Sequence, residues 1–272
     1  MQQMGVLVWW SALSVVSVVN IVAWCLVARR QARDELEGAA ARRERRLQLV
    51  LSAMFVAGCA FRSFLPRAEG QRIVLVDTWL SSVIISRAIA TVAELALVAQ
   101  WTVYLGHWTR ATRAPWAYAL TRLFLPAIAF AEVCSWYTTL TTNFAGSVIE
   151  ESTWAVTSTV MTSMMVVLWV RRTEFRRLFI ATAIVLNTAY VVFMANVDVP
   201  MYRARVRADA ASGKAFVTVT EGFLDSARRR VLTRRWVDWK DEMPWMSLYF
   251  SAGVWISLAI VRAPRLERRT LA

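Results

Sequence analysis

Four charged side chains lie inside stretches that are otherwise apolar enough to cross a lipid bilayer. Arg87 and Glu94 fall within one apolar run, and Arg122 and Glu132 fall within the next. A charge at bilayer depth costs several kcal/mol unless it is paired or hydrated, and such residues commonly mark the pathways of substrates, ions or protons. These four residues are therefore the first candidates for a functional site.

The positions of the four residues predict two ion pairs. In two antiparallel helices joined by a short loop, residues at equal depth have a constant sum of residue numbers. The sums for Arg87 with Glu132 and for Glu94 with Arg122 differ by only three, and both pairs combine opposite charges. Two interpretations are open: the pairs hold the helices in register, or they line a path through the membrane.

A second group of polar residues gathers around the predicted outer ends of the apolar runs. Together these residues predict a polar pocket that opens outward. The candidate binding residues of this mouth are Arg62, Trp136, Asn143, Glu150, Glu151 and Asp198. A structural interpretation is also open, because Glu150 and Glu151 complement the dipole of a helix that begins there and Trp136 fits an aromatic belt. Arg62 can extend to the membrane surface.

The composition argues against several kinds of chemistry. His107 is the only histidine and the three cysteines form no CxxC motif, so we predict neither a metal site nor a cofactor. The two lysines, Lys214 and Lys240, lie outside the apolar runs, which argues against a retinal Schiff base. The chain has no Gly-rich phosphate loop and no Ser/His/Asp set, so we assign no catalytic residue.

Seven apolar runs of about 20 residues, the length that crosses a bilayer core, must position these side chains. The chain has 272 residues, of which 57% are hydrophobic, and so many apolar runs cannot be buried in one soluble core. The predicted fold is all-α, a polytopic membrane bundle that forms a single domain over residues 1–272. The seven predicted transmembrane helices cover residues 6–28, 47–64, 79–107, 116–140, 152–170, 178–199 and 244–261.

The distribution of arginine predicts the orientation of the bundle. Seventeen arginines fall in the segments on one side of the predicted membrane, including the basic loop 29–46, whereas only Arg67 and Arg72 fall in the short segments on the other side. Positive charges gather on the cytoplasmic side of membrane proteins. We therefore predict an outer N-terminus, a cytoplasmic C-terminus and a multi-pass protein of a bacterial inner membrane. The net charge of +13 is then a signal of topology, and we expect no binding to nucleic acid.

Residues 200–243 form one long segment between the sixth and seventh predicted helices, and we expect them to cap the outer end of the bundle. Within this cap, residues 215–220 alternate between apolar and polar like a short strand. From residue 223 to 239, apolar residues recur at helical spacing opposite a row of arginines. This pattern predicts an amphipathic helix that lies on the membrane surface or covers the bundle.

The predicted function is the binding or conduction of a small polar or charged solute, or of a lipid headgroup, without enzymatic activity. Arg87 and Glu132 would form the gate, and Glu94 and Arg122 an inner relay. An alternative is an interaction subunit or sensor whose cap binds a protein partner. A third hypothesis is an intramembrane enzyme on lipid or quinone that uses Glu94 or Glu132 as acid or base. The expected partners are membrane lipids, a small polar ligand, and another protein or a second copy of the chain.

Overall fold

The computed structural model of the chain describes residues 2–33, 38–111, 114–170 and 177–263. Most of these residues are helical, and six helices are long and apolar enough to cross a membrane. The six helices are Gln3–Arg33, Ala39–Phe64, Val83–Arg110, Pro115–Thr141, Leu178–Ala211 and Met243–Arg262. The predicted all-α, multi-pass character of the chain is thereby confirmed.

The fifth predicted run also folds as a helix, α5 (Ala145–Val170), but it is not among these six. Its middle carries a series of hydroxyl side chains between Ser152 and Ser163. Four of these hydroxyl groups donate to carbonyl groups four residues earlier in the same helix. Serine and threonine are tolerated in this way within membrane helices because their hydroxyl groups find partners inside the helix.

The described chain forms two compact units. Unit 1 contains residues 2–100 and 223–263, and unit 2 contains residues 101–222. The helix α3 (Val83–Ala111) contributes its first part to unit 1 and its last part to unit 2.

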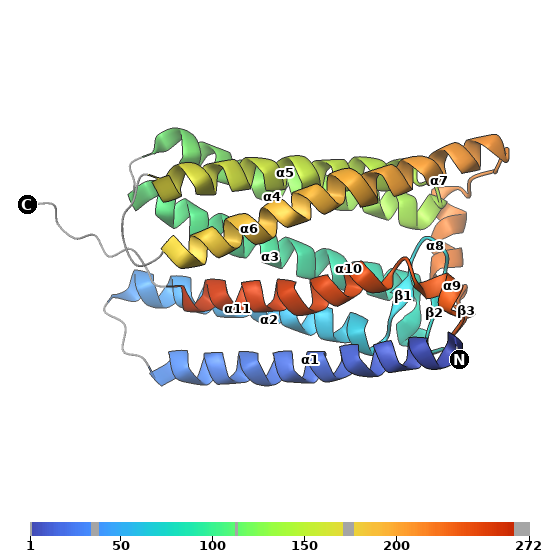
Figure 1. Cartoon of the computed structure of the whole chain (residues 1–272), viewed down its shortest axis with the longest axis horizontal. Helices are drawn as coiled ribbons and strands as arrows, with labels where there is room; N and C mark the ends of the chain where they lie inside the picture. Colours follow the sequence, from blue (N-terminus) through green and yellow to red (C-terminus); the bar gives the residue numbers. More distant parts are fainter. Residues whose placement is uncertain (1, 34–37, 112–113, 171–176, 264–272) are drawn as a thin grey trace, which may run out of the picture. The chain divides into compact units, whose positions relative to one another are not determined.

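Unit 1 is built on α1 (Gln2–Arg33), α2 (Ala39–Phe64), the first part of α3 and a composite last helix. The last helix consists of α10 (Met243–Leu248), a π-helical turn η3 (Tyr249–Gly253) and α11 (Val254–Arg262). The helices α1, α2 and α11 lie side by side (Figure 1). Their shared core includes Leu13, Phe55, Val56, Phe250, Val254 and Leu258.

The contact between α2 and α3 depends on a glycine. A Cβ atom placed on Gly58 would lie 2.6 Å from the Cβ atom of Ala93 and 3.4 Å from the carbonyl oxygen of Ile89. Small residues of this kind allow the backbones of two membrane helices to approach closely. This close approach brings the C-terminal part of α2 and the N-terminal part of α3 together.

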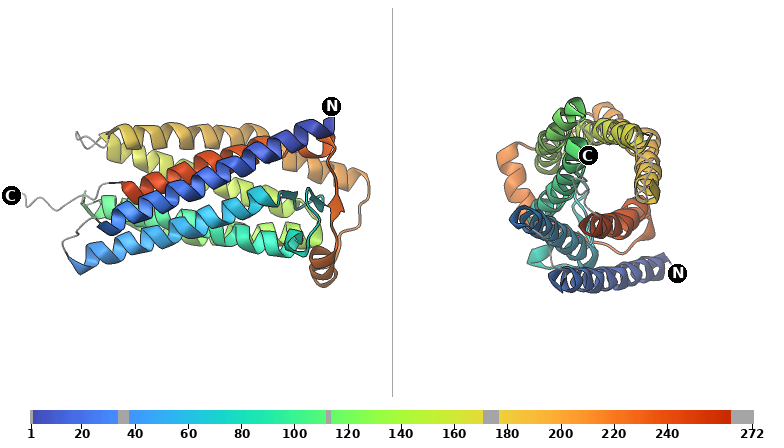
Figure 2. Two further views of the ribbon diagram at one scale, coloured as in Figure 1. Left: turned by 90° about the horizontal axis from the view of Figure 1, so that it is seen from below. Right: turned by 90° about the vertical axis from the view of Figure 1, so that its left-hand side faces the viewer.

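A small sheet joins the connection between α2 and α3 to the cap. The strands are β1 (Arg67–Ala68), β2 (Ile73–Val74) and β3 (Val231–Leu232), in the order β1-β2-β3. The first pair is antiparallel, with Arg67 opposite Val74, and the second is parallel, with Ile73 opposite Val231. The sheet and the short helix α9 (Trp236–Trp239) lie at the N-terminal end of α1 (Figures 1 and 2).

Unit 2 contains the last part of α3, α4 (Pro115–Thr141), α5, α6 (Arg177–Phe193), a π-helical turn η2 (Met194–Asp198) and α7 (Val199–Ala211). The helix α5 packs between α4 and α6. A Cβ atom on Gly146 would lie 2.4 Å from the carbonyl oxygen of Cys134, so α4 and α5 are in tight contact. Asn187 of α6 donates to the Ser158 carbonyl at 2.9 Å, which ties α6 to α5.

Several element boundaries differ from those predicted. The third helix begins at residue 83, not 79, because residues 79–81 form a 3-10 turn, η1 (Trp79–Ser81), and residue 82 is extended. The basic loop 29–46 is largely helical, since α1 continues to residue 33 and α2 begins at residue 39. Residues 34–37 of that loop lie outside the described ranges.

The cap differs from the prediction in both of its expected elements. No strand forms over residues 215–220: residues 215–218 have no regular secondary structure, and α8 (Val219–Arg228) begins at residue 219. The single helix predicted over residues 223–239 is divided into α8, β3 and α9. The division has a clear cause, because the Val231 amide donates to the Arg72 carbonyl at 2.8 Å and the chain leaves the helix to join the sheet.

Candidate functional site: a ring of buried charges

The connection between α2 and α3 folds inward, so that its arginines are buried. Arg67 is only 1% exposed, and its two terminal nitrogens donate to the carbonyl groups of Ser81 and Ser82. Burial, reinforced by the neighbouring positive charge of Arg62, lowers the pKa of Arg67 to about 10. Arg67 therefore remains charged at neutral pH, in a place where a cation is costly.

Arg72 secures the turn of the hairpin. Its backbone has a φ of 58°, a left-handed conformation that costs about 1–2 kcal/mol for a residue other than glycine. The side chain holds this conformation, because its Nε atom donates to Asp225 at 3.0 Å and its Nη1 atom donates to the Glu69 carbonyl at 3.2 Å. The hairpin is thus attached to α8 and aims the side chain of Glu69 at α2 and α3.

Four largely buried side chains form a closed ring of alternating charge, which we name the charge ring: Arg62, Glu69, Arg87 and Glu94. The nitrogens of Arg62 lie 3.3 Å from Glu69 and 3.9 Å from Glu94. The nitrogens of Arg87 lie 3.6 Å from Glu69 and 3.1 Å from Glu94. Each guanidinium group is therefore shared by two carboxylates, and each carboxylate by two guanidinium groups.

Three segments position the charge ring. Arg62 comes from the last turn of α2, and Glu69 lies in the turn between β1 and β2. Arg87 and Glu94 are seven residues apart on α3, which places them on one face about two helical turns apart. The side chains of the arginines are 6–7% exposed and those of the glutamates 12% exposed, so all four charges are largely removed from water.

Aromatic residues of the last helix cover Arg62. The guanidinium carbon of Arg62 lies 5.5 Å from the ring centre of Trp245 and 5.7 Å from that of Phe250. Cation–π contacts of this kind stabilise a desolvated cation by about 2 kcal/mol. Phe250 belongs to the π-helical turn η3, and its carbonyl oxygen accepts a hydrogen bond from Asn20 at 2.8 Å. Single π-helical turns occur frequently at functional sites, where they alter the position of side chains on a helix.

The charge ring has no net charge, yet each member has a second partner of opposite sign. Loss of one contact leaves the other in place, so the ring can open on one side without leaving a buried charge alone. An incoming ion can replace one member as partner of the next. The arrangement is therefore suited to binding or gating a charged solute, and it is equally able to lock three segments together.

Unit 1 contains a second polar cluster on α2, α3 and α11. The amide groups of Gln48 and Gln100 each donate to the backbone carbonyl of the other residue, at 3.1 and 3.3 Å. The hydroxyl of Ser257 donates to Gln100 Oε1 at 2.6 Å and lies 2.9 Å from the hydroxyl of Ser52. Hydrogen bonds of this kind between membrane helices are worth about 0.6–2 kcal/mol each and fix the packing of the helices.

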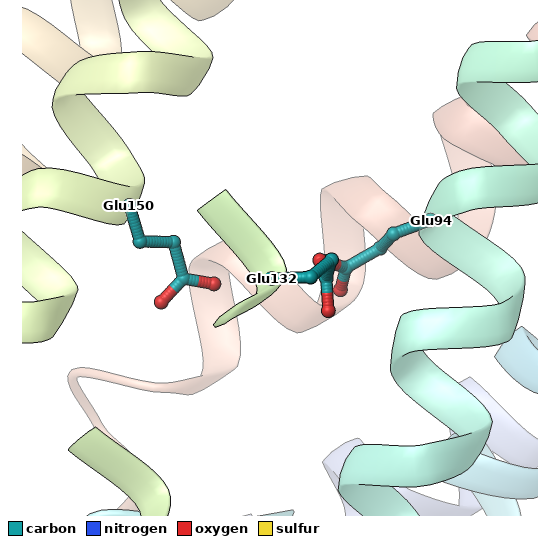
Figure 3. A group of neighbouring side chains, drawn as sticks. All are labelled: Glu94, Glu132 and Glu150. Atoms are coloured by element: carbon teal, nitrogen blue, oxygen red, sulfur yellow. The ribbon is translucent and has the colours of Figure 1, made fainter. Parts of the chain in front are cut away.

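Unit 2 contributes a pair of buried carboxylates. Figure 3 shows the side chain of Glu150 on α5 extending toward Glu132 on α4, and the two residues have carboxylate oxygens within 4.8 Å of each other. Glu132 is 2% and Glu150 7% exposed. Two carboxylates this close repel each other when both are ionised. Two oxygen ligands alone do not make a metal site, because Ca²⁺ takes about 6–8 and Mg²⁺ about six ligands.

Of the predicted candidates, the structure brings together Arg62, Arg87 and Glu94. Within unit 1, Glu94 pairs with Arg87 and Arg62, and in unit 2 Arg122 is exposed on α4. The predicted pairing of Glu94 with Arg122 joins residues of different units and stays a prediction. The pairing of Arg87 with Glu132 joins residues of different units and stays a prediction.

The other predicted residues of the mouth lie in unit 2. Asn143 caps α5, because its Oδ1 atom accepts a hydrogen bond from the Ala145 amide at 2.9 Å. Trp136, Glu151 and Asp198 are partly buried, and Asp198 ends the π-helical turn η2. Because α5 begins at Ala145 and has no acidic residue in its first turn, Glu150 and Glu151 do not lie at the start of the helix as the dipole interpretation required. The part of these residues in a binding pocket stays a prediction.

Sequence reasoning missed Glu69, which completes the charge ring. Glu69 stands in a short segment between two arginines, where an acidic residue is ordinarily exposed to water. Its burial follows only from the folding of the hairpin over α2 and α3. Apolar residues after the turn, Ile73, Val74 and Leu75, are the one sequence signal that this connection is buried.

No family model matches the chain, and no curated protein or solved structure matches it. A function must therefore be inferred from the side chains themselves.

Proposed function

We propose that the chain is an integral membrane protein that binds or conducts a small charged solute at an outward-facing site built on the charge ring. The observation that supports this function most directly is the closed alternation of Arg62, Glu69, Arg87 and Glu94. Ionised groups in a membrane protein are expensive, and they persist where they contact a substrate or ion pathway.

In the proposed topology, the chain has seven spans, with α5 as the seventh, and lies in a bacterial inner membrane. The N-terminus is outside and the C-terminus is in the cytoplasm. The excess of arginine at the predicted inner segments supports this orientation. With this orientation, Arg62 and the β1–β2 hairpin lie at the outer end of unit 1, and Glu94 lies deeper along α3.

The last helix is the proposed gate. Trp245 and Phe250 cover Arg62, and Phe250 lies in the π-helical turn η3. A π-helical turn contains one residue more than the α-helical turn that it replaces, and its hydrogen bonds rearrange more easily than those of a regular helix. A shift of η3 would move the aromatic rings from Arg62 and expose one side of the charge ring to the solute.

Flux into proteoliposomes tests this function. Vesicles containing the purified full-length protein would be loaded with dyes for protons, potassium and chloride in parallel. We expect one of these ions to cross faster than in protein-free vesicles, and Glu94→Gln to change its rate at least tenfold, the effect of about 1.4 kcal/mol. The matched control is Glu221→Gln, which neutralises an exposed carboxylate of α8.

A purely structural role for the charge ring gives a different result. The wild type would then carry none of the three ions. Glu94→Gln would lower the melting temperature, and a simultaneous Arg87→Gln would restore much of it without any effect on flux. That combination would contradict the proposed function.

A further inference from the structure

The cap of unit 1 presents apolar side chains to the exterior although it lies outside the long apolar helices. Six of its residues between positions 223 and 237 are 41–56% exposed. We name these residues, with the arginines among them, the arginine–apolar face. Its apolar members are Phe223, Leu224, Val231, Leu232, Trp236 and Val237. Six exposed apolar side chains on consecutive segments outside a membrane span, α8, β3 and α9, indicate a binding surface.

The charge of this face identifies the kind of partner. Arg228, Arg229, Arg234 and Arg235 are exposed among the apolar residues. Two acidic residues lie beside these arginines: Asp225 is held by Arg72 at 3.0 Å and Arg229 at 3.9 Å, and Asp238 pairs with Arg235 at 2.8 Å. Within the described residues, no ion pair is formed by Arg228 or Arg234. Arg228 and Arg234 therefore give the face a positive charge, and a complementary partner is anionic.

Contacts with α1 determine the depth of this face. The Trp236 ring lies 3.5 Å from the position of a Cβ atom on Gly5, and the rings of Trp239 and Trp9 are 6.0 Å apart. Gly5 and Trp9 belong to the first two turns of a helix long and apolar enough to span a membrane. The arginine–apolar face therefore lies level with the end of that helix, where hydrocarbon gives way to headgroups.

We propose that the arginine–apolar face binds the headgroups of anionic phospholipids. Arg228 and Arg234 contact the phosphate groups, while Val231, Leu232 and Trp236 enter the boundary of the acyl chains. Basic residues that alternate with aromatic and aliphatic ones at this depth are the chemistry that retains such lipids. An acidic protein would match the positive charge of the face, but its acidic surface would not offer the exposed apolar residues the hydrocarbon contact that a lipid offers. This site is separate from the charge ring and does not depend on the proposed function.

Lipid retention tests the site. The full-length protein would be purified from nanodiscs containing equal parts of phosphatidylglycerol and phosphatidylcholine, and the lipids that stay bound would be counted by native mass spectrometry. Each arginine near an anionic surface contributes about fivefold to binding, so Arg228→Gln with Arg234→Gln should weaken retention of phosphatidylglycerol about thirtyfold. High salt should weaken the wild type similarly.

The matched control is Arg203→Gln with Arg207→Gln, which removes the same charge from two exposed arginines of α7. We expect this control to retain phosphatidylglycerol as the wild type does. Both double variants should melt like the wild type in phosphatidylcholine alone, since all four side chains are exposed. Equal losses in the two double variants, or no loss in either, would overturn the proposal.

A second measurement tests the apolar contact. Brominated phosphatidylglycerol should quench the fluorescence of Trp236 in the wild type. The variant Trp236→Phe lacks this tryptophan, so its fluorescence should be quenched less. If a water-soluble quencher reached Trp236 in these discs and the brominated lipid did not, the face would be open to solvent or to a protein, and the proposal would be wrong.

Discussion

The substitution Glu94→Gln should reveal how strongly the charge ring holds unit 1 together. At an effective dielectric constant of about 20, the separation of 3.1 Å between Arg87 and Glu94 corresponds to an attraction of about 5 kcal/mol before desolvation is subtracted. Removal of one partner of a buried pair costs about 3–5 kcal/mol, because the remaining charge stays buried. In Glu94→Gln, Arg62 and Arg87 both lose the carboxylate that they share, so the loss of stability should fall in this range.

The double variant Arg87→Gln with Glu94→Gln should be more stable than expected from the sum of the stability losses of the two single variants. It leaves the pair of Arg62 with Glu69 at 3.3 Å, and the ring again has no net charge. We expect the two substitutions to be non-additive by about 2–3 kcal/mol, the upper end of coupling energies between residues in contact.

Thermal melting in detergent micelles, followed by tryptophan fluorescence, measures the stability of the wild type, the two single variants and the double variant. A loss of 3–5 kcal/mol corresponds to roughly 6–20 °C for a chain of this size. The reasoning would be refuted if Glu94→Gln melted within about a degree of the wild type, or if the loss in the double variant equalled the sum of the two single losses.

Two further predictions concern packing and pH. Gly58→Ala should lower stability by about 1–3 kcal/mol, because its new Cβ atom would lie 2.6 Å from that of Ala93. Gly106→Ala, whose Cβ atom meets nothing closer than 3.7 Å, is the control in the same melting assay. Hydrogen bonds from Arg235 and Thr233 hold the pKa of Asp238 below its ordinary 3.8, so its stabilisation of the cap is present above about pH 4 and is lost as the pH falls through the lowered value. In limited proteolysis between pH 2 and 6, the cap of the wild type should be cleaved faster as the pH falls. The cap of Asp238→Asn should be cleaved equally fast at every pH in this range. Parallel pH profiles of cleavage in the two proteins would contradict this prediction.

Hydropathy and charge along the sequence identified most of the helices and three members of the charge ring. Apolar runs of about 20 residues are a local property of the chain, and so is an arginine or glutamate inside such a run. Arg62, Arg87 and Glu94 were therefore recognisable from the sequence. The partner of each charge was not, because pairing depends on which helices are neighbours and how they are rotated.

The cap likewise shows that local sequence patterns do not determine which distant segments pair. The row of arginines opposite apolar residues predicted one amphipathic helix where the structure has α8, β3 and α9. Pairing of Val231 with the hairpin replaced the local helical preference by hydrogen bonds to a distant segment. Tertiary contacts of this kind routinely override helical propensity.

The amino-acid sequence by itself determined that the chain is a multi-pass helical membrane protein with ionised residues in its spans, since water-to-lipid transfer acts on each run separately. Only the tertiary structure decided that a buried hairpin carries Glu69 to those residues and closes them into a ring. A charge is stabilised by atoms within a few ångströms, and which atoms those are depends on how distant segments fold together.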